Sequence, residues 1–362
     1  MNELEASRLT IQQCDKEIAE LFEKRMEAAR GVLNYKMQNG LPIYDPEQEA
    51  RVIEHNSVYV KDPVIKEYYV PFLKNVMDLS KAYQTRLMSG MKVAYSGIPG
   101  AFAHIAGQKL FQNAEFIPCP DFESAYHSCE NGEADIVVLP IENSYSGDVG
   151  GVMDLAFNGN LYVNMMIDLN VTQNLMGIKG SSQESIKTVV SHPQALAQCA
   201  RFIKSHGYKT VEFENTARAA KYVAESNDKS IAAIASAETA AEYGLKLLAE
   251  HINASTSNTT RFAVFSKVKN SPSGKESYDR NFILMFMVKN EAGALAKALN
   301  IIGSHGFNMS NLHSRPTKGT MWSYYFYAEL EGNVNSSEGD DLLRQLGTVC
   351  EKIKMVGSYK RV

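Results

Sequence analysis

One long helical pattern at the N-terminus constrains the fold more than any other feature of this sequence. Apolar residues recur at three- and four-residue intervals from Leu4 to Leu33, and the first proline of the chain is Pro42. The pattern predicts a single helix from about Leu4 to Gln38, some 50 Å long at about 1.5 Å per residue. A compact domain of about 90 residues cannot bury the apolar stripe of so long a helix, so we expect a partner chain to cover it.

Two further helices complete an all-helical domain, which we place at residues 1–90. The run Asp45-Pro46-Glu47-Gln48 combines an N-cap aspartate, a first-turn proline and a capping-box glutamine, and it predicts a helix start. A third helix is expected over about residues 64–87, after Asp62-Pro63.

The middle of the chain, residues 91–270, has an α/β pattern. Short β-branched runs alternate with helical stretches such as Phe122–Asn131 and Gln194–His206. We expect mostly parallel strands, including Ala134–Leu139 and Arg261–Lys267, in two small lobes with a ligand-binding cleft between them.

A polar segment that contains proline and glycine, residues 269–279, predicts a linker to a third domain at residues 280–362. In that domain the order strand, helix, strand, strand, helix, strand predicts a ferredoxin-like βαββαβ fold. A module of this kind is either purely structural or a ligand sensor.

Composition and charge exclude several classes of protein. The 362 residues are 44% hydrophobic and carry a net charge of −4, without a long apolar run, so we expect no membrane span and no nucleic-acid partner. The five cysteines are widely spaced and form no CxxC pair, which predicts reduced thiols in a cytoplasmic protein. The eight histidines have no metal-site spacing, so no metal ion is expected.

Three basic residues of the first helix fit one ligand site. Arg25 and Lys36 are eleven residues apart, close to three full turns, so they project from the same helix face. Arg8 lies seventeen residues before Arg25, about 25 Å along the axis, and reaches the same ligand only from a second, antiparallel chain. On spacing alone, Arg25 and Lys36 also fit a solvated helix face.

Two polar pairs at helical spacing add to this pattern. Asp45 and Glu49 form one i,i+4 pair, and Ser80 and Gln84 form another on an otherwise apolar helix. Each pair has an ordinary alternative, since Asp45 also serves as an N-cap and Ser80 and Gln84 also fit a surface.

Across most of residues 5–86 the chain resembles the all-helical chorismate mutase family. The residues that carry the resemblance are Arg8, Asp15, Arg25, Lys36, Asp45, Glu49, Ser80 and Gln84. The resemblance implies an intertwined homodimer that converts chorismate to prephenate without a covalent intermediate. It also implies that Arg8 of the partner subunit and Arg25 bind the carboxylates, while Lys36 and Gln84, the catalytic pair, donate to the ether oxygen.

The remaining mutase residues have implied binding roles. By the same resemblance Glu49 binds the ring hydroxyl, and Asp45 and Ser80 line the pocket. The family often has arginine where this chain has Gln48, so one positive charge near the ligand is missing at that position.

Polar motifs in the α/β region adjoin the expected strands. Pro140-Ile141-Glu142-Asn143-Ser144 and Ser191-His192-Pro193-Gln194, with Gln198 one helical turn further, each follow a strand. Thr260-Arg261-Phe262 enters the last strand, and Ser96-Gly97-Ile98-Pro99-Gly100 is a strand-to-helix turn suited to an anion. Singly, each motif also fits turn chemistry or helix capping.

Together these motifs resemble prephenate dehydratase over about residues 91–268. The resemblance implies a two-lobed fold of the periplasmic-binding-protein type, conversion of prephenate to phenylpyruvate with loss of carbon dioxide and water, and no cofactor. Thr260 is the implied catalytic residue, which donates a hydrogen bond or relays a proton to the ring hydroxyl. The implied substrate-binding residues are Glu142, Asn143, Ser191, Gln198, Thr260 and, as a supporting charge, Arg261. Hydroxyl residues are frequent in the family where this chain has Ala101 and Ala103, so backbone N–H groups are expected to act there.

The third domain resembles the ACT regulatory domain that is appended to prephenate dehydratases. The resemblance implies a phenylalanine site made by neighbouring chains, with free N–H groups at the helix start. The implied site residues are Gly293, Ala294, Leu295, Asn308, Asn311, Ser314 and Arg315. His313 stands where the family usually has glutamate.

These features predict a cytoplasmic, homo-oligomeric, bifunctional enzyme that takes chorismate and prephenate as substrates and phenylalanine as an inhibitor. Two alternatives remain open at this point. One is a monofunctional dehydratase whose helical domain only dimerises, which the Gln48 substitution favours. The other is a binding protein without catalysis, in which the two-lobed domain is a ligand sensor.

Overall fold

The computed structural model describes residues 2–38, 46–254, 258–269, 281–317 and 323–361, and the chain divides into two compact units, 1–91 and 92–362. The first unit is helical: α1 (Glu3–Gln38), α2 (Pro46–Ser57) and α3 (Pro63–Ser89). α1 confirms the single long helix. The Asp62 side chain caps α3 by accepting from the Val64 and Ile65 N–H groups at 2.8 and 3.1 Å, whereas the expected N-cap Asp45 lies outside the described residues.

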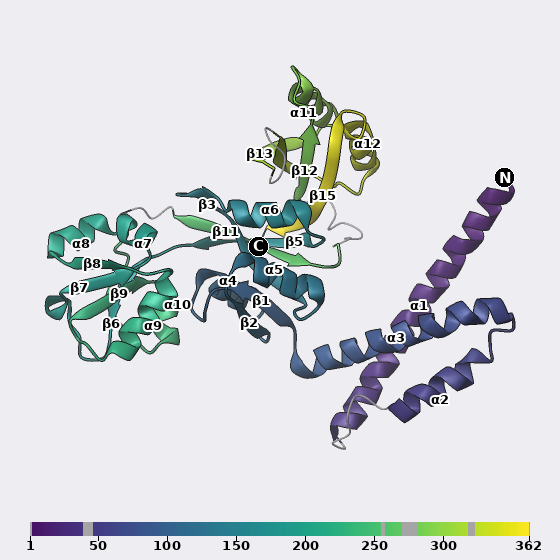
Figure 1. Ribbon diagram of the computed structural model, residues 1–362, viewed down its shortest axis with the longest axis horizontal. Coiled ribbons are helices and arrows are strands. Elements are labelled where there is room, and N and C mark those ends of the chain that lie inside the picture. Colours follow the sequence, from purple (N-terminus) through teal and green to yellow (C-terminus); the bar gives the residue numbers. More distant parts are fainter. Residues whose placement is uncertain (1, 39–45, 255–257, 270–280, 318–322, 362) are drawn as a thin grey trace. The chain divides into compact units, whose positions relative to one another are not determined.

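Much of α1 has its apolar side chains in solvent. Leu33 is buried with Leu73 and Met77 of α3, but Ile11 and Leu21 are 59% and 62% exposed. Figure 1 shows the N-terminal part of α1 extending past α3. An exposed apolar stripe of this kind is typical of a surface that a protein–protein contact covers.

The first lobe of the second unit is a sheet covered by helices (Figure 1). Its strands are β1 (Lys92–Ser96), β2 (Glu115–Cys119), β3 (Ile136–Asn143), β4 (Gly147–Asp148), β5 (Tyr162–Asn170) and β11 (Thr259–Ser266). Its helices are α4 (Phe102–Leu110), α5 (Phe122–Asn131) and α6 (Gly150–Asn158). The expectation of mostly parallel strands fails in this lobe. Its β1–β2 and β1–β3 pairs are parallel, but β11 runs antiparallel to both β3 and β5, and β4 runs antiparallel to β3.

The second lobe is inserted between β5 and β11. Its five-stranded sheet has the order β10-β6-β9-β7-β8: β6 (Asn174–Gly177), β7 (Thr188–Ser191), β8 (Lys209–Glu212), β9 (Ile231–Ala235) and β10 (Lys246–Ala249). A 3₁₀ turn, η1 (Gln183–Ser185), precedes β7, and four helices follow: α7 (Pro193–Gln198), α8 (Ala200–His206), α9 (Thr216–Ser226) and α10 (Ala237–Glu242). The helix expected over 194–206 is therefore two helices, which break at Cys199.

The third domain confirms the predicted βαββαβ order. It comprises β12 (Asn281–Val288), α11 (Ala294–Ser304), β13 (Asn308–Pro316), β14 (Tyr324–Glu331), α12 (Ser337–Leu346) and β15 (Cys350–Arg361). The end of β15 pairs with β5, so the sheets of the first lobe and of the third domain join into one ten-stranded sheet. Gly357 permits this approach, because a Cβ there would overlap the Val163 carbonyl.

A half-buried lysine lies at the same junction. Lys354 of β15 donates to the Gly159 carbonyl and, at 3.4 Å, to the Phe157 carbonyl at the C-terminal end of α6. Burial lowers the pKa of Lys354 to about 8, and the nearby Lys352 adds to the effect while Glu130 opposes it. The charge of Lys354 therefore costs stability in the folded state.

This lowered pKa predicts a pH-dependent stability. Between about pH 8 and the ordinary lysine value of about 10.4, the unfolded chain binds more protons at this residue than the folded chain. The free energy of unfolding of wild type, relative to Lys354→Met, should therefore rise with pH across that window and stay constant below it. Denaturant titrations at pH 7.5 and 10 measure this difference; the exposed Lys246→Met is the control. An equal difference at both pH values would contradict it.

Candidate functional site

A pocket of about 300 Å³ in the helical unit gathers most of the residues predicted for it. Its polar lining comes from all three helices: Arg25, Lys36, Gln48, Glu49, Ser80, Lys81 and Gln84. Five of these were predicted as site residues from the sequence. The long helix and the two shorter ones thus bring distant polar positions to one cavity.

The side chains of this pocket are already held in place. Arg25 donates to the Ser80 hydroxyl and, at 3.3 Å, to the Val76 carbonyl, and burial lowers the pKa of Arg25. Gln84 is buried and its Nε2 donates to the Ala29 carbonyl at 2.7 Å. These contacts orient both donors before any ligand arrives.

Two residues predicted for this pocket are not among those that line it, and one residue that was not predicted does line it. Arg8 lies on α1 about 25 Å from Arg25 and is exposed, and Asp45 lies outside the described residues. Lys81, which the sequence analysis did not single out, reaches the pocket and pairs with Glu49 at 2.8 Å and Asp78 at 2.9 Å. The sequence feature that could have indicated this role is the position of Lys81 directly after Ser80, a predicted site residue.

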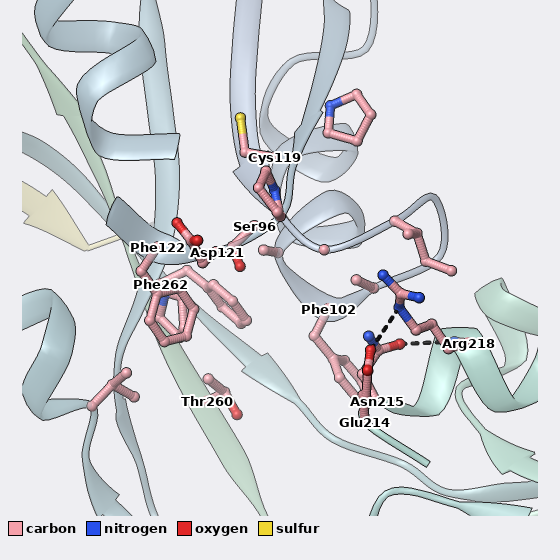
Figure 2. A pocket seen from close by; sticks show the side chains of 18 of the residues that line it. Ser96, Phe102, Cys119, Asp121, Phe122, Glu214, Asn215, Arg218, Thr260 and Phe262 are labelled. Carbon is pink, nitrogen blue, oxygen red and sulfur yellow. Dashed lines mark hydrogen bonds and ion pairs between the residues drawn. The ribbon is translucent and has the colours of Figure 1, made fainter. Parts of the chain in front are cut away.

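A larger cavity of about 720 Å³ lies between the two lobes of the second unit. Figure 2 shows Ser96, Phe102 and Thr260 from the first lobe facing Glu214 and Arg218 from the second. An adjoining cavity of about 230 Å³ shares Thr260 and Asn143, and adds His192, Gln198 and Asn258. The predicted cleft between the lobes is therefore present.

Asn143 controls the orientation of Thr260. Its Oδ1 accepts from the Tyr145 and Ser146 N–H groups, each at 3.0 Å, and from the Ser146 hydroxyl at 3.1 Å. These donors fix the amide, so Nδ2 must face Thr260, and it donates to Oγ1 at 2.8 Å. With a lone pair thus occupied, the Thr260 hydroxyl can donate its own proton into the cavity.

The same amide continues into a chain of hydrogen bonds between the lobes. Asn143 Nδ2 also donates to Asn258 Oδ1 at 2.9 Å, and Asn258 Nδ2 donates to Gln198 Oε1 at 3.1 Å. Asn143, Thr260 and Gln198 are thereby brought together. Asn258 adds a link that the sequence analysis did not assign.

Three other predicted residues do not line these cavities. β3 extends to Asn143 rather than ending at Leu139, so strand alternation sends Glu142 to the opposite face. Arg261 faces away from Thr260 for the same reason, and contacts Glu142 at 3.1 Å, Asp168 at 2.9 Å and Glu329 of β14 at 3.5 Å.

Ser191 is the third of these residues. It is fully buried and donates to the Ile234 carbonyl at 2.6 Å, which is a structural contact between β7 and β9.

The turn before α4 has alanine at Ala101 and Ala103, and that its backbone N–H groups act on a substrate stays a prediction. Ala101 is the N-cap of α4 and its side chain makes no cap hydrogen bond. The Gly100 N–H instead donates to His104 Nδ1 at 3.1 Å. Burial lowers the pKa of His104, which keeps the ring neutral and able to accept.

The predicted effector residues lie in two segments of the third domain. Gly293, in the left-handed region at φ 80°, is the N-cap of α11, whose first turn holds Ala294 and Leu295. The other residues lie along β13: Asn308, Asn311, Ser314 and Arg315. Asn308 donates to Glu331 at 2.9 Å, and neither segment lines the cavities described above.

Two side chains of β13 contact the first lobe instead. His313 Nδ1 lies 3.0 Å from Asp148, and Arg315 lies 3.5 Å from Asp154, whose carboxylate also accepts from Tyr325 at 2.7 Å. Glu142, Asp148 and His313 each offer an atom within 4.8 Å of the others, but the Arg261 guanidinium already supplies the positive charge beside Glu142. The absence of a metal ion stays a prediction.

Comparison with known proteins places all three domains. Family models for chorismate mutase type II, prephenate dehydratase and the ACT domain match residues 7–85, 93–270 and 282–348. A bifunctional chorismate mutase/prephenate dehydratase of Neisseria gonorrhoeae is 32% identical over 97% of this chain and 95% of its own length. The chain belongs to this bifunctional family.

Two further relatives agree with this assignment. The bifunctional chorismate mutase/prephenate dehydratase of Aquifex aeolicus is 30% identical over 100% of this chain and 99% of its own length. The structure of the Arthrobacter aurescens prephenate dehydratase in complex with L-Phe is 29% identical, with a TM-score of 0.68 over 75% of this chain and 90% of that one. The predicted mutase, dehydratase and ACT domains are confirmed. Among the described residues, no helix has the length and apolar character that a membrane span needs.

Proposed function

We propose that this bifunctional family member converts chorismate to prephenate in its helical unit and prephenate to phenylpyruvate between the lobes of its second unit. The observation that carries the proposal is the Asn143–Thr260 hydrogen bond inside the inter-lobe cavity, since it leaves a directed hydroxyl donor there. We place the protein in the cytoplasm, with domains at 1–90, 91–270 and 280–362.

The mutase reaction needs a folded dicarboxylate and a donor at the ether oxygen, because charge develops on that atom. Arg25 is assigned to a carboxylate, and Lys36 and Gln84 to the ether oxygen. Glu49 accepts from the ring hydroxyl, with Ser80 beside it. The second copy of the chain supplies Arg8, and its α1 covers the exposed apolar stripe of this one.

In the dehydratase reaction, the bond between the ring and its carboxylate breaks and releases carbon dioxide. The electron pair completes the aromatic ring and expels the ring hydroxyl, which takes a proton and leaves as water. Thr260 donates to that hydroxyl, while Asn143 and Gln198 hold the ring region. Neither reaction transfers electrons to a cofactor.

Phenylalanine is the proposed inhibitor of the dehydratase. Support comes from the ACT family match and from the relative whose structure contains L-Phe. The joined sheet and the His313–Asp148 and Arg315–Asp154 contacts give β13 a direct route to the dehydratase lobe.

A coupled assay from chorismate tests the three parts together. Chorismate should be consumed, phenylpyruvate should appear, and added phenylalanine should suppress the second step. Turnover of prephenate but not of chorismate would instead support the monofunctional alternative, and no turnover of either would support a binding protein.

Removing the Thr260 hydroxyl should disable one activity only. Thr260→Ala is expected to lower dehydratase turnover by at least ~100-fold, because a positioned proton donor contributes that much. Thr260→Ser should recover much of it, and mutase activity should be unchanged. Thr259→Ala is the matched control, since its hydroxyl bonds Asn170 outside the cavity. Equal losses in the Thr259 and Thr260 variants would contradict the assignment.

Mixing two inactive mutase variants should restore activity. Homodimers of Arg8→Ala or of Arg25→Ala lack an arginine in both sites, but a heterodimer holds one site with both arginines. Co-refolded mixtures should therefore reach about a quarter of wild-type chorismate turnover. A mixture that stays as inactive as its components would rule out Arg8 acting across chains.

The contact between β13 and the first lobe predicts a variant that loses regulation. A methyl group at Gly150 would overlap the Arg315 guanidinium, so Gly150→Ala should displace Arg315 from Asp154. We expect the phenylalanine concentration for half inhibition to rise at least ~5-fold, with uninhibited dehydratase activity retained. Gly151→Ala is the matched control, because its added methyl group makes only an ordinary contact with Phe122. An unchanged response would argue against this route.

A further inference from the structure

The predicted supporting charge of the dehydratase site, Arg261, is not among the residues that line the inter-lobe cavities. Prephenate carries two carboxylates, and Arg261, the predicted supporting charge, faces away and is surrounded by three carboxylates. We propose that Arg218 of the second lobe binds the side-chain carboxylate of the substrate. The inference rests on the proposed dehydratase function and names a further substrate-binding residue for it.

Arg218 has the right location for this role. It lines the inter-lobe cavity, and Figure 2 shows it across from Thr260, at the start of α9. Among the described residues that line the two adjoining cavities, it is the only arginine or lysine. A carboxylate in this space has no other described side chain with a permanent positive charge to meet.

The contacts of Arg218 leave its guanidinium accessible. Its side chain is 53% exposed, and its Nε lies 3.1 Å from the Glu214 carboxylate. This single exposed ion pair is of the kind that contributes little to stability. A guanidinium has two edges that can each bind a carboxylate, so a substrate can share it with Glu214 or displace Glu214.

Helix stability does not explain an arginine here. Arg218 lies in the first turn of α9, where the helix dipole disfavours a cation. The cap itself is made by Asn215, whose side chain accepts from the Arg218 N–H at 2.7 Å. The positive charge and the positive end of the dipole instead add together toward the cavity, which suits an anion.

The chemistry selects which carboxylate Arg218 binds. The ring carboxylate loses its charge as carbon dioxide forms, so a strong ion pair there would stabilise the substrate more than the transition state. The side-chain carboxylate keeps its charge throughout, so an ion pair there binds substrate and transition state equally. Such uniform binding affects KM rather than kcat.

Steady-state kinetics of the full-length protein tests this assignment. Arg218→Met should raise the KM for prephenate ~10- to 100-fold and change kcat less than ~3-fold, with Arg218→Lys intermediate. Arg201→Met, at an exposed arginine of α8 in the same lobe, should leave both constants unchanged. Mutase activity of each preparation reports that the helical unit is folded, and the retained kcat for prephenate reports that the dehydratase unit is folded.

Phenylpyruvate distinguishes the two carboxylates, because it retains only the one on the side chain. Its inhibition constant should rise in Arg218→Met by about the same factor as the KM. An unchanged KM, a loss in kcat alone, or an unchanged inhibition constant for phenylpyruvate would each overturn the inference while wild-type turnover still supported the proposed function. A wild-type protein without dehydratase activity would refute the proposed function itself.

Discussion

The antiparallel pairing of β11 with β3 is the interaction on which both the dehydratase site and its contact with the ACT domain depend. The register sets Thr260 opposite Asn143, and Arg261 opposite Glu142. Because side chains alternate along a strand, the first pair faces the cavity while the second pair faces the ACT strand β14. A shift by one residue would exchange the two faces, so this register specifies a donor on one side and an ion-pair cluster on the other.

Features that depend on local sequence periodicity could be predicted from the sequence. The long α1 and the βαββαβ order were predictable, because helical spacing and strand–helix alternation are local properties. Helix geometry placed Arg25 with Lys36, and Ser80 with Gln84, on shared faces, whereas their assignment to one mutase site came from the family resemblance. Glu142 and Arg261 were predicted as substrate-site residues but lie on the face opposite Thr260, which could be foreseen only by knowing that β3 continues to Asn143.

Local sequence patterns could not identify the roles of residues that depend on tertiary contacts. Like Asn143, Ser191 belongs to a polar motif at the end of a strand. Its hydroxyl, however, donates to the Ile234 carbonyl of the neighbouring strand β9. Arg218 and Lys81 belong to no motif that was identified in the sequence. They line a cavity only because another lobe or another helix packs across from them. Both are charged side chains next to polar residues of the site.

The two cavities hold different numbers of cations, and the chemistry accounts for the difference. Arg25, Lys36 and Lys81 line the mutase pocket, and because chorismate and prephenate both carry two carboxylates, the proposed Arg25 contact holds substrate and product alike. Rate enhancement there must come from the donors at the ether oxygen, where charge changes. In the dehydratase one carboxylate leaves as a neutral gas, and a second fixed cation would oppose that loss. The proposed single arginine on the carboxylate that persists, with the proposed hydroxyl donor at the departing oxygen, would satisfy both the binding and the chemical step.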